Sequence, residues 1–300
     1  MPSGMCLFSV LLILFTSVLC DSQTATCTNW TYFNLPASWS GSPQAINRWS
    51  TMVGIAHPRN RGDVTAYGFV RYLNGGFKTY AVPNASATVF TRRNALGVTV
   101  GWYIDATSSE HHHGVVFSGS SMATVNYPGA TDTVLTGINY WGSIVGYYSK
   151  DSFNTFDGFE LKNGKFTRIH FPGSAQTSAA SISDKGVVVG TYSVSPVITH
   201  GFILANGVYK TFDHPKTSGL AVARTRPFDI NASGTIVGAY DIPPFPDSGL
   251  PFIYTNGKFK DIVVPNSQNP IVSGINGYGF VVGNASFSTG VGPSFKAHCQ

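Results

Sequence analysis

The chain has 300 residues, and its net charge of +5 arises from 19 basic and 14 acidic residues. Charged residues make up only 11% of it and form no long basic run, so phosphate neutralisation is excluded as the main source of affinity for a partner. We therefore expect no nucleic-acid partner, and the length is compatible with one large all-β domain.

The first twenty residues contain no Lys, Arg, Asp or Glu, and residues 7–19 are rich in leucine, valine, isoleucine and phenylalanine. This stretch is shorter than the roughly 20 residues that span a bilayer as a helix, and it lies where a secretory signal has its apolar core. We interpret residues 1–20 as the signal peptide of a secreted protein and residues 21–300 as one domain without a transmembrane segment. Lipidation of Cys20 is the alternative to free secretion.

A repeat of roughly 46 residues runs through the rest of the chain. It is marked by a Val-Gly pair whose glycine recurs at intervals of 47, 45, 44, 48 and 45 residues, at Gly54, Gly101, Gly146, Gly190, Gly238 and Gly283. The residue seven positions earlier is always Asn or Ser, at Asn47, Asn94, Asn139, Ser183, Asn231 and Asn276. In five of the six units a glycine follows that residue by three positions. This pattern predicts a tight hairpin built on a type I turn.

Each unit continues with a Gly-Phe-like pair and, in four units, an Asn-Gly pair, which is the strongest short-range hairpin signal. Four short strands per unit follow. In the unit that begins at Asn139 we expect them near residues 136–138, 143–147, 158–161 and 166–171. Four tyrosines stand two residues after the Val-Gly glycine, which favours a packing role for Tyr103, Tyr148, Tyr192 and Tyr240.

The two ends of the repeat array complete each other. A proline ends each fourth strand, and Pro36 stands 11 positions before Asn47, the same interval as in later units. Residues 30–36 are therefore interpreted as a fourth strand without its first three, while the last unit lacks a fourth. This predicts a six-bladed β-propeller of four-stranded blades, closed by the N-terminal strand, with a disulfide between Cys27 and Cys299.

The units resemble a family of bacterial extracellular repeat proteins named for a His-Ala-Phe motif. The matching residues are Ile138-Asn139, Gly142, Ile144-Val145-Gly146, Pro128-Gly129-Ala130-Thr131 and His200-Gly201-Phe202, where glycine replaces the alanine of the motif. The resemblance covers nearly the whole mature chain. It implies an exported repeat protein, and it supplies no catalytic residues.

The candidate binding residues lie in the longer connections, because variable loops on a rigid scaffold are the more common binding surface. Histidines and carboxylates near residue 111 have the chemistry of zinc ligands, but His113 occupies the repeat position of His200, and neighbouring residues on a strand point to opposite faces. We favour a solvated loop there and expect no metal and no cofactor. The candidate ligand-binding residues are Arg61, Asp105, His111, His112, Tyr148, Asp151, Arg224, Arg226 and Asp241.

Three functions remain open. The first is a monomeric, non-enzymatic extracellular binding module whose unknown ligand is a glycan or a protein. The second is a lyase or hydrolase of polysaccharide or small lactones, with acid–base groups drawn from His111, His112, Asp105, Asp151 and Asp241 at the axial mouth. The third is a purely structural envelope protein.

Overall fold

The computed structural model describes residues 23–59, 65–106, 111–243, 249–287 and 290–300. The regular elements of these residues are strands, apart from one 3-10 turn at Pro215–Thr217. The expected all-β class is therefore confirmed. Within the described ranges no helix is long and apolar enough to cross a membrane.

Four sheets are antiparallel and have four strands each. One contains β3 (Trp39–Ile46), β4 (Met52–Pro58), β5 (Tyr67–Arg71) and β6 (Phe77–Tyr80). The next contains β7 (Ala85–Arg93), β8 (Thr99–Asp105), β9 (His112–Ser118) and β10 (Ser121–Thr124). A third contains β11 (Asp132–Ile138), β12 (Ile144–Ser149), β13 (Asp157–Lys162) and β14 (Lys165–Ile169). The last contains β23 (Ile271–Ile275), β24 (Phe280–Phe287), β25 (Gly290–Cys299) and, from the N-terminus, β2 (Cys27–Phe33).

The fifth sheet has nine strands. It contains β15 (Gln176–Ile182), β16 (Val188–Ser195), β17 (Ile198–Ala205), β18 (Val208–Phe212), β19 (Ala223–Ile230), β20 (Ile236–Asp241), β21 (Leu250–Thr255), β22 (Lys258–Asp261) and β1 (Gln23–Thr24). Two groups of four strands, β15–β18 and β19–β22, are joined in it by a short parallel ladder between β17 and β19, in which Ile198 pairs with Ala223 and Thr199 with Arg224.

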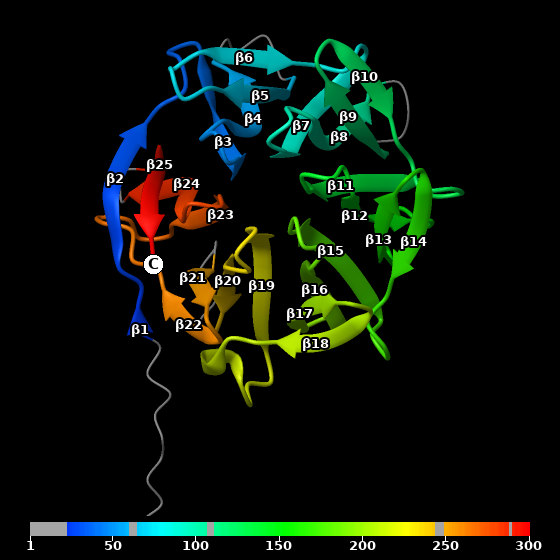
Figure 1. The fold of residues 1–300 in the computed structure, drawn as a ribbon, viewed down its shortest axis with the longest axis vertical. Coiled ribbons are helices and arrows are strands. Elements are labelled where there is room, and N and C mark those ends of the chain that lie inside the picture. The colour runs from blue at the N-terminus through cyan, green and yellow to red at the C-terminus, as the bar shows by residue number, and fades with distance from the viewer. Residues whose placement is uncertain (1–22, 60–64, 107–110, 244–248, 288–289) are drawn as a thin grey trace, which may run out of the picture.

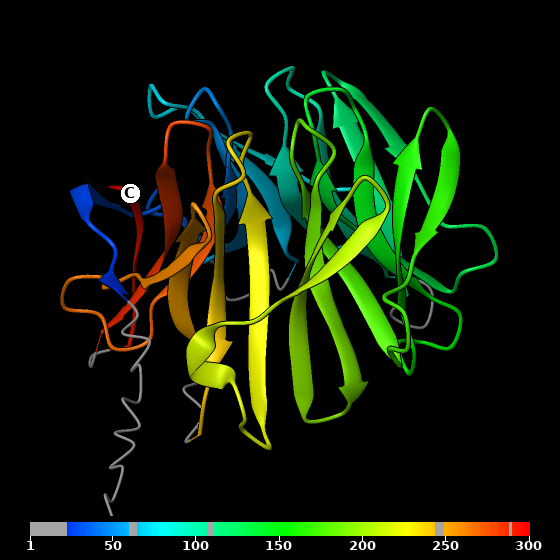
Figure 2. The same cartoon turned by 60° about the horizontal axis from the view of Figure 1, so that its bottom comes forward.

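The sheets stand around a central axis, and the first strand of each unit is innermost (Figure 1). Seen from the side, tight turns close one end of the ring and longer connections the other (Figure 2). We call these ends the turn face, which carries the six turns that begin at the repeated Asn or Ser, and the loop face. The inner strands are longer than expected. β11, for example, begins at Asp132 rather than near residue 136.

The core is divided into layers between neighbouring sheets. Phenylalanines of the Gly-Phe position fill these layers, and Phe69, Phe159, Phe202, Phe252 and Phe295 are fully buried. Burying one such side chain contributes about 2 to 3 kcal/mol to stability. Tyrosines confirm the expected packing role at three of four positions, because Tyr148, Tyr192 and Tyr240 stack on Tyr127, Phe171 and His214 with ring centroids 3.6, 3.6 and 3.8 Å apart.

The repeated Val-Gly glycine is required by a close approach of two strands. Each inner strand contains a bulge opposite this glycine, as between Leu135 and Gly137 of β11. A Cβ atom at Gly146 would lie 2.0 Å from the carbonyl oxygen of Val134, and the equivalent glycines have equally close neighbours. The bulge therefore explains why the glycine recurs in every unit.

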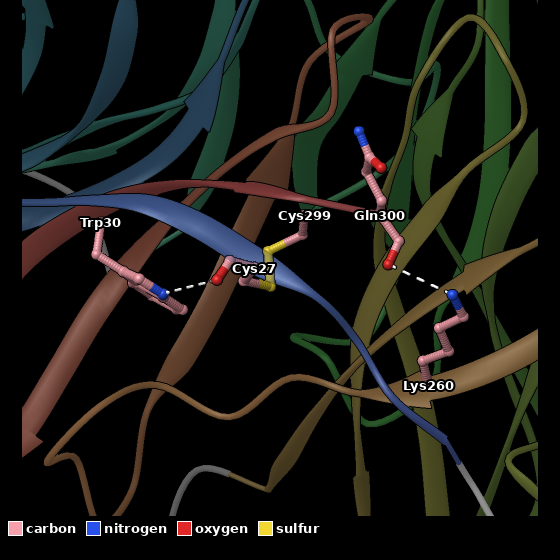
Figure 3. Close-up of a disulfide and its surroundings, with 5 residues drawn as sticks. All are labelled: Cys27, Trp30, Lys260, Cys299 and Gln300. Atoms are coloured by element: carbon pink, nitrogen blue, oxygen red, sulfur yellow. Dashed lines mark hydrogen bonds between the residues drawn. A yellow bond between two sulfur atoms is a disulfide. The ribbon is translucent and has the colours of Figure 1, made fainter.

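The N-terminal segment crosses the gap between two groups of strands. Its first strand, β1, runs parallel to β22, and β2 then pairs antiparallel with β25, so that Cys27 lies opposite Cys299. A disulfide joins these two cysteines, as expected, and Figure 3 shows it beside Trp30, whose Nε1 donates to the carbonyl oxygen of Cys27 at 3.2 Å. The N-terminal strand begins at Cys27 rather than at Trp30.

Candidate functional site

The turn face is organised by the repeated asparagines. The side-chain oxygen of Asn94 accepts hydrogen bonds from the backbone N–H groups of Leu96 and Val98, which shapes the turn locally. Its Nδ2 donates to the carbonyl oxygen of Asn139, in the next turn of the ring, at 3.2 Å. Gly97, which completes the turn, has a φ of +88°, a conformation that favours glycine. The predicted turn chemistry is confirmed.

The same bond passes from turn to turn around the axis. It runs from Asn47 to Asn94, Asn94 to Asn139, Asn139 to Ser183, Asn231 to Asn276 and Asn276 to Asn47. The interval from Ser183 to Asn231 lacks it because serine has no amide to donate. We call this set of hydrogen bonds the asparagine ring.

An ion pair crosses the axis two residues deeper in the strands. Arg92 of β7 donates from Nε to Asp229 of β19 at 3.1 Å, and the two side chains are only 11% and 6% exposed. The Arg92 guanidinium also donates to the carbonyl oxygens of Gln44, Thr91 and Phe228 at 2.6 to 2.8 Å. A buried charge is tolerated only when it is paired and hydrogen-bonded, and Arg92 meets both conditions.

Asp229 is satisfied just as fully. Its Oδ1 also accepts from the hydroxyl of Ser181 at 2.7 Å and from the backbone of Ile230 at 2.9 Å. Its Oδ2 accepts from the backbone of Ile275 at 2.9 Å. With these bonds the carboxylate holds three inner strands, β15, β19 and β23, together.

Small residues at the equivalent repeat position make this crossing possible. The residue two positions before the turn Asn or Ser is Ala45, Arg92, Gly137, Ser181, Asp229 or Gly274. The backbone packs tightly there, since a Cβ atom on Gly274 would lie 2.9 Å from the Cα of Ala45. Four small residues therefore leave room for one long cation and one carboxylate.

A cavity of about 350 Å³ opens above the ion pair on the turn face. Arg92, Asp229 and Ser181 line its base, and the mouth is formed by the residues that follow the turn Asn or Ser. These mouth residues are Arg48, Ala95, Tyr140, Asp184, Ala232 and Gly277. In ring order, Arg48 stands between the small residues Gly277 and Ala95, and Tyr140 and Asp184 lie next to each other.

The mouth residues are held in place by bonds between turns. Asp184 accepts from the backbone N–H of Tyr140 at 2.8 Å, and Arg48 donates to the hydroxyl of Tyr278 at 3.4 Å. This bond and the hydroxyl's electrostatic influence raise the pKa of the Arg48 guanidinium, so it is a permanent cation at the rim. The mouth therefore offers a charged donor, a carboxylate and phenol groups to a ligand.

Exposed aromatic side chains surround this mouth. Trp49, Tyr140, Trp141 and Tyr278 are all exposed, and Trp141 is 75% exposed. Both indoles are hydrogen-bonded at Nε1, from Trp49 to the carbonyl oxygen of Ala95 and from Trp141 to that of Asp184, each at 3.0 Å. Exposed tryptophans fixed beside a polar cavity are a feature of binding sites more than of plain surface.

The described residues among the predicted binding residues lie in or beside three separate sheets. His111 and His112 both contact the buried Asp132 of β11, with Nδ1 to Oδ1 distances of 3.3 and 3.6 Å. Burial lowers the pKa of His112, and Asp132 opposes this effect. The backbone N–H of His112 donates to Asp132 at 2.9 Å, so the carboxylate anchors the start of β9.

Tyr148 and Asp151 have local structural contacts. Tyr148 stacks on Tyr127, and burial raises the pKa of its hydroxyl. Asp151 accepts from the hydroxyl of Ser149 and from both the backbone and the hydroxyl of Thr155, and these bonds lower its pKa. These bonds hold the carboxylate of Asp151 within its own loop.

On β19 and β20 two predicted residues do meet. Arg226 donates from Nη2 to Asp241 at 3.1 Å, and Arg224 pairs in register with Asp241. Asp105 ends β8, opposite Ala85. Arg61 lies outside the described residues. The sequence analysis named Arg226 and Asp241 as separate ligand-binding candidates, and the structure pairs them with each other near the loop face.

The histidines of the Gly-Phe motif have a structural explanation. His200 pairs with Asp213 at 2.7 Å, and in the preceding unit the same two positions hold Asp157 and His170, at 2.6 Å. The acid and the imidazole have exchanged places, and the bond between the third and fourth strands is kept. His113 makes the corresponding bond to Asn126. In the part of the chain that the structure describes, no three His, Cys, Asp or Glu side chains gather as a metal site would require.

The axial residues were missed by sequence reasoning, although a signal for them exists. An alignment of the six units places one arginine and one aspartate among small residues at a single position, two before the turn. Opposite charges at one position of a ring-forming repeat indicate a contact across the axis. Loop length by itself points instead to the loop face.

Comparison with known proteins supports the fold and leaves the family open. No family model and no curated protein matches the chain. The lectin of Aleuria aurantia, in a structure with α-methyl-L-fucoside, is 11% identical with a TM-score of 0.53, covering 90% of this chain and 96% of that one. A second structure of that lectin, described as a six-bladed β-propeller, is 12% identical with a TM-score of 0.50, covering 83% and 88%.

A gluconolactonase from Xanthomonas campestris is similar to the same degree. It is 10% identical with a TM-score of 0.52, covering 94% of this chain and 96% of that one. At this level of identity the likeness concerns the fold alone, and it shows that the chain has a β-propeller fold.

Proposed function

We propose that this β-propeller is an exported, non-enzymatic module that binds a saccharide in the axial cavity of its turn face. One observation carries the proposal. The cavity has a base whose charges are already neutralised by each other, and its mouth is surrounded by exposed, fixed aromatic rings.

We further propose that the molecule has six blades and is closed by its N-terminal strand. Each repeat unit supplies one group of four strands, and the nine-stranded sheet is two such groups joined by two residue pairs. β2 supplies the fourth strand of the last group, and the disulfide between Cys27 and Cys299 fastens it there. This bridge suits an oxidising compartment and supports export with residues 1–20 as the signal.

The resemblance to repeat proteins of the His-Ala-Phe family stays a proposal of the same kind. It agrees with the repeat but adds no ligand.

A sugar ring matches the chemistry of the mouth. One face of a pyranose presents C–H groups that pack on the electron-rich face of an aromatic ring, while its hydroxyls seek donors and acceptors. Tyr140 and Tyr278 supply ring faces at the mouth, and Arg48 and Asp184 supply polar partners. A volume of about 350 Å³ is in the range of small-ligand sites. A lectin of the same fold, in complex with α-methyl-L-fucoside, supports this ligand class.

Binding is favoured over hydrolysis because the axial carboxylate is a buried part of the scaffold. Asp229 accepts from Arg92, Ser181 and two backbone N–H groups, and these bonds hold it between the inner strands. A general base needs an accessible lone pair within reach of its substrate. The gluconolactonase likeness keeps lactone hydrolysis as the rival, and it is tested alongside.

The test is a titration of the purified protein followed by calorimetry and tryptophan fluorescence. The probes are α-methyl-L-fucoside, glucose, galactose and N-acetylglucosamine, with D-glucono-1,5-lactone assayed for turnover. At least one sugar is expected to bind, and a concentration of 100 Kd stabilises the native state by about 2.7 kcal/mol.

Two variants locate the binding. Arg48→Ala, which removes a mouth residue, is expected to weaken it about tenfold, as for one lost charged hydrogen bond. Arg59→Ala, on an exposed arginine of the loop face, is the matched control and is expected to change nothing. The proposal fails if no sugar binds, if the control variant has the same effect, or if the lactone is turned over.

A further inference from the structure

The residues two positions after the turn Asn or Ser form a second ring, outside the mouth. They are Trp49, Leu96, Trp141, Lys185, Ser233 and Tyr278. Four of them belong to turns that follow one another around the axis, in the order Tyr278, Trp49, Leu96 and Trp141, and these are 55%, 58%, 64% and 75% exposed. We call these four residues the apolar arc. The two remaining positions, Lys185 and Ser233, are polar.

The aromatic members of the arc are fixed rather than free. Trp49 belongs to one turn and donates to the carbonyl oxygen of Ala95 in the next turn, and Trp141 donates in the same way to Asp184. Each indole therefore bridges two neighbouring turns with its N–H group satisfied. The Arg48 guanidinium, 5.4 Å from the Trp49 ring, supports it from the side of the mouth. A ring held in this way loses little conformational entropy when a ligand covers it.

The arc is continuous with the cavity. Tyr278 belongs to both, since it lines the cavity and bonds to Arg48 of the mouth. Tyr140 and Trp141 are neighbours in one turn and pack edge to face with centroids 5.1 Å apart, so the cavity wall passes directly into the arc. A ligand larger than one sugar ring that starts in the cavity can therefore extend directly over these aromatic groups.

We infer that the apolar arc binds a saccharide chain, with one unit in the axial cavity and neighbouring units stacked on Trp49 and Trp141. This inference rests on the proposed function and extends it from a single sugar to an oligosaccharide. A chain of sugar rings fits because it presents apolar faces at intervals and hydroxyls between them. The arc offers two fixed indole faces, on turns that are separated by the one turn of Leu96. A protein partner would have no need of the cavity in the middle.

The experiment compares the binding of saccharides of increasing length. Oligomers of one to six units, β-1,4-linked glucose and β-1,4-linked N-acetylglucosamine, are titrated against the full mature protein by calorimetry. Affinity for at least one series is expected to rise about tenfold or more between one and four units, as for one or two added aromatic contacts. It should then level off once the arc is covered.

Variants of the arc separate the added contacts from the cavity. Trp49→Ala and Trp141→Ala should lower the affinity for the four-unit chain towards that for one unit, and leave the affinity for one unit within about twofold. Trp49→Phe and Trp141→Phe retain a ring face and should recover most of the gain. Leu73→Ala, on a leucine that is 69% exposed in the turn between β5 and β6, is the control outside the arc and should have no effect.

Each result has one meaning. Equal affinities for one and four units, or a gain with length that survives both alanine variants, overturn the chain-binding inference and leave the proposed function standing. Absence of binding by any sugar, short or long, overturns the proposed function and this inference with it. Unchanged thermal unfolding of the alanine variants ensures that a lost gain is not a folding defect.

Discussion

The two ends of the propeller axis are built from the same repeat by opposite rules. On the turn face the six turns have nearly the same backbone, and side chains tie each turn to the next through the asparagine ring. On the loop face the connections differ, and their polar groups satisfy one another within a loop, as Asp151 does with Ser149 and Thr155. The end with the least sequence variation is therefore the more strongly tied.

A repeat protein can thus carry a candidate site at the end where its units differ least. A conserved turn presents its following residues at equivalent points of a ring, so one change per unit suffices to place Arg48, Tyr140 or Asp184 at the mouth. The loop face requires whole loops to be shaped. Four predictions test how far the two ends differ.

The largest expected effect comes from removing the disulfide that fastens β2 to β25 at the turn face. Cys27→Ser combined with Cys299→Ser removes a bridge that spans 272 residues of sequence, and we expect a loss of about 3 to 5 kcal/mol of stability. Urea unfolding of the unaltered protein and of the variant measures it. Equal stability of the two proteins would mean that strand pairing between β2 and β25 holds the N-terminal strand by itself.

Breaking the ion pair between Arg92 and Asp229 should lower the stability of the protein nearly as much. Asp229→Ala leaves Arg92 buried without a counter-charge, and we expect a loss of about 3 to 5 kcal/mol. Asp241→Ala, near the loop face, should cost less, because Arg226 is 33% exposed and water can take over its charge. Chemical denaturation compares the two variants, and an equal loss would contradict the proposed difference between the ends.

Substitutions in the asparagine ring should change the stability by less, and one of them should raise it. Asn139→Ala removes the amide that bonds to Ser183 and the oxygen that caps the turn at Ser143, which should cost about 1 to 3 kcal/mol. Ser183→Asn should complete the ring towards the Asn231 carbonyl and stabilise the protein by about 0.5 to 1.5 kcal/mol. Thermal unfolding of both variants reads the sign, and a destabilised Ser183→Asn would show that this interval cannot accept the bond.

The smallest effect concerns pH at the loop face. Burial lowers the pKa of His112, so between its folded and unfolded values the unfolded chain binds more protons and stability rises with pH. This contribution is complete above about pH 6.5 and is lost as the pH falls, at no more than about 1.4 kcal/mol per pH unit for one proton.

His112→Phe keeps a ring between Trp102 and Phe153 and should flatten the pH dependence of unfolding between about pH 5 and 7. Identical pH profiles for His112→Phe and the unaltered protein would show that the burial of His112 does not cause this pH dependence.

Much of the scaffold was predictable from the sequence because its determinants are local or periodic. The turn at Asn94 needs only its own side chain and a glycine at the fourth position, and the pairing of Cys27 with Cys299 follows from the unit count. The site was less predictable. Arg92 and Asp229 are 137 residues apart, and nothing near either residue shows that they meet.

The sequence by itself therefore determined the repeat, its turns, the all-β class and the disulfide, since each depends on spacing or on neighbouring residues. Only the tertiary structure decided which face carries the cavity and which side chains share it. Arranging the strands around one axis brings equivalent positions of different units together, so residues that are unremarkable in their own units become neighbours. The physical reason is that packing across an axis depends on the sum of side chains from every unit, here four small residues and one opposite-charge pair.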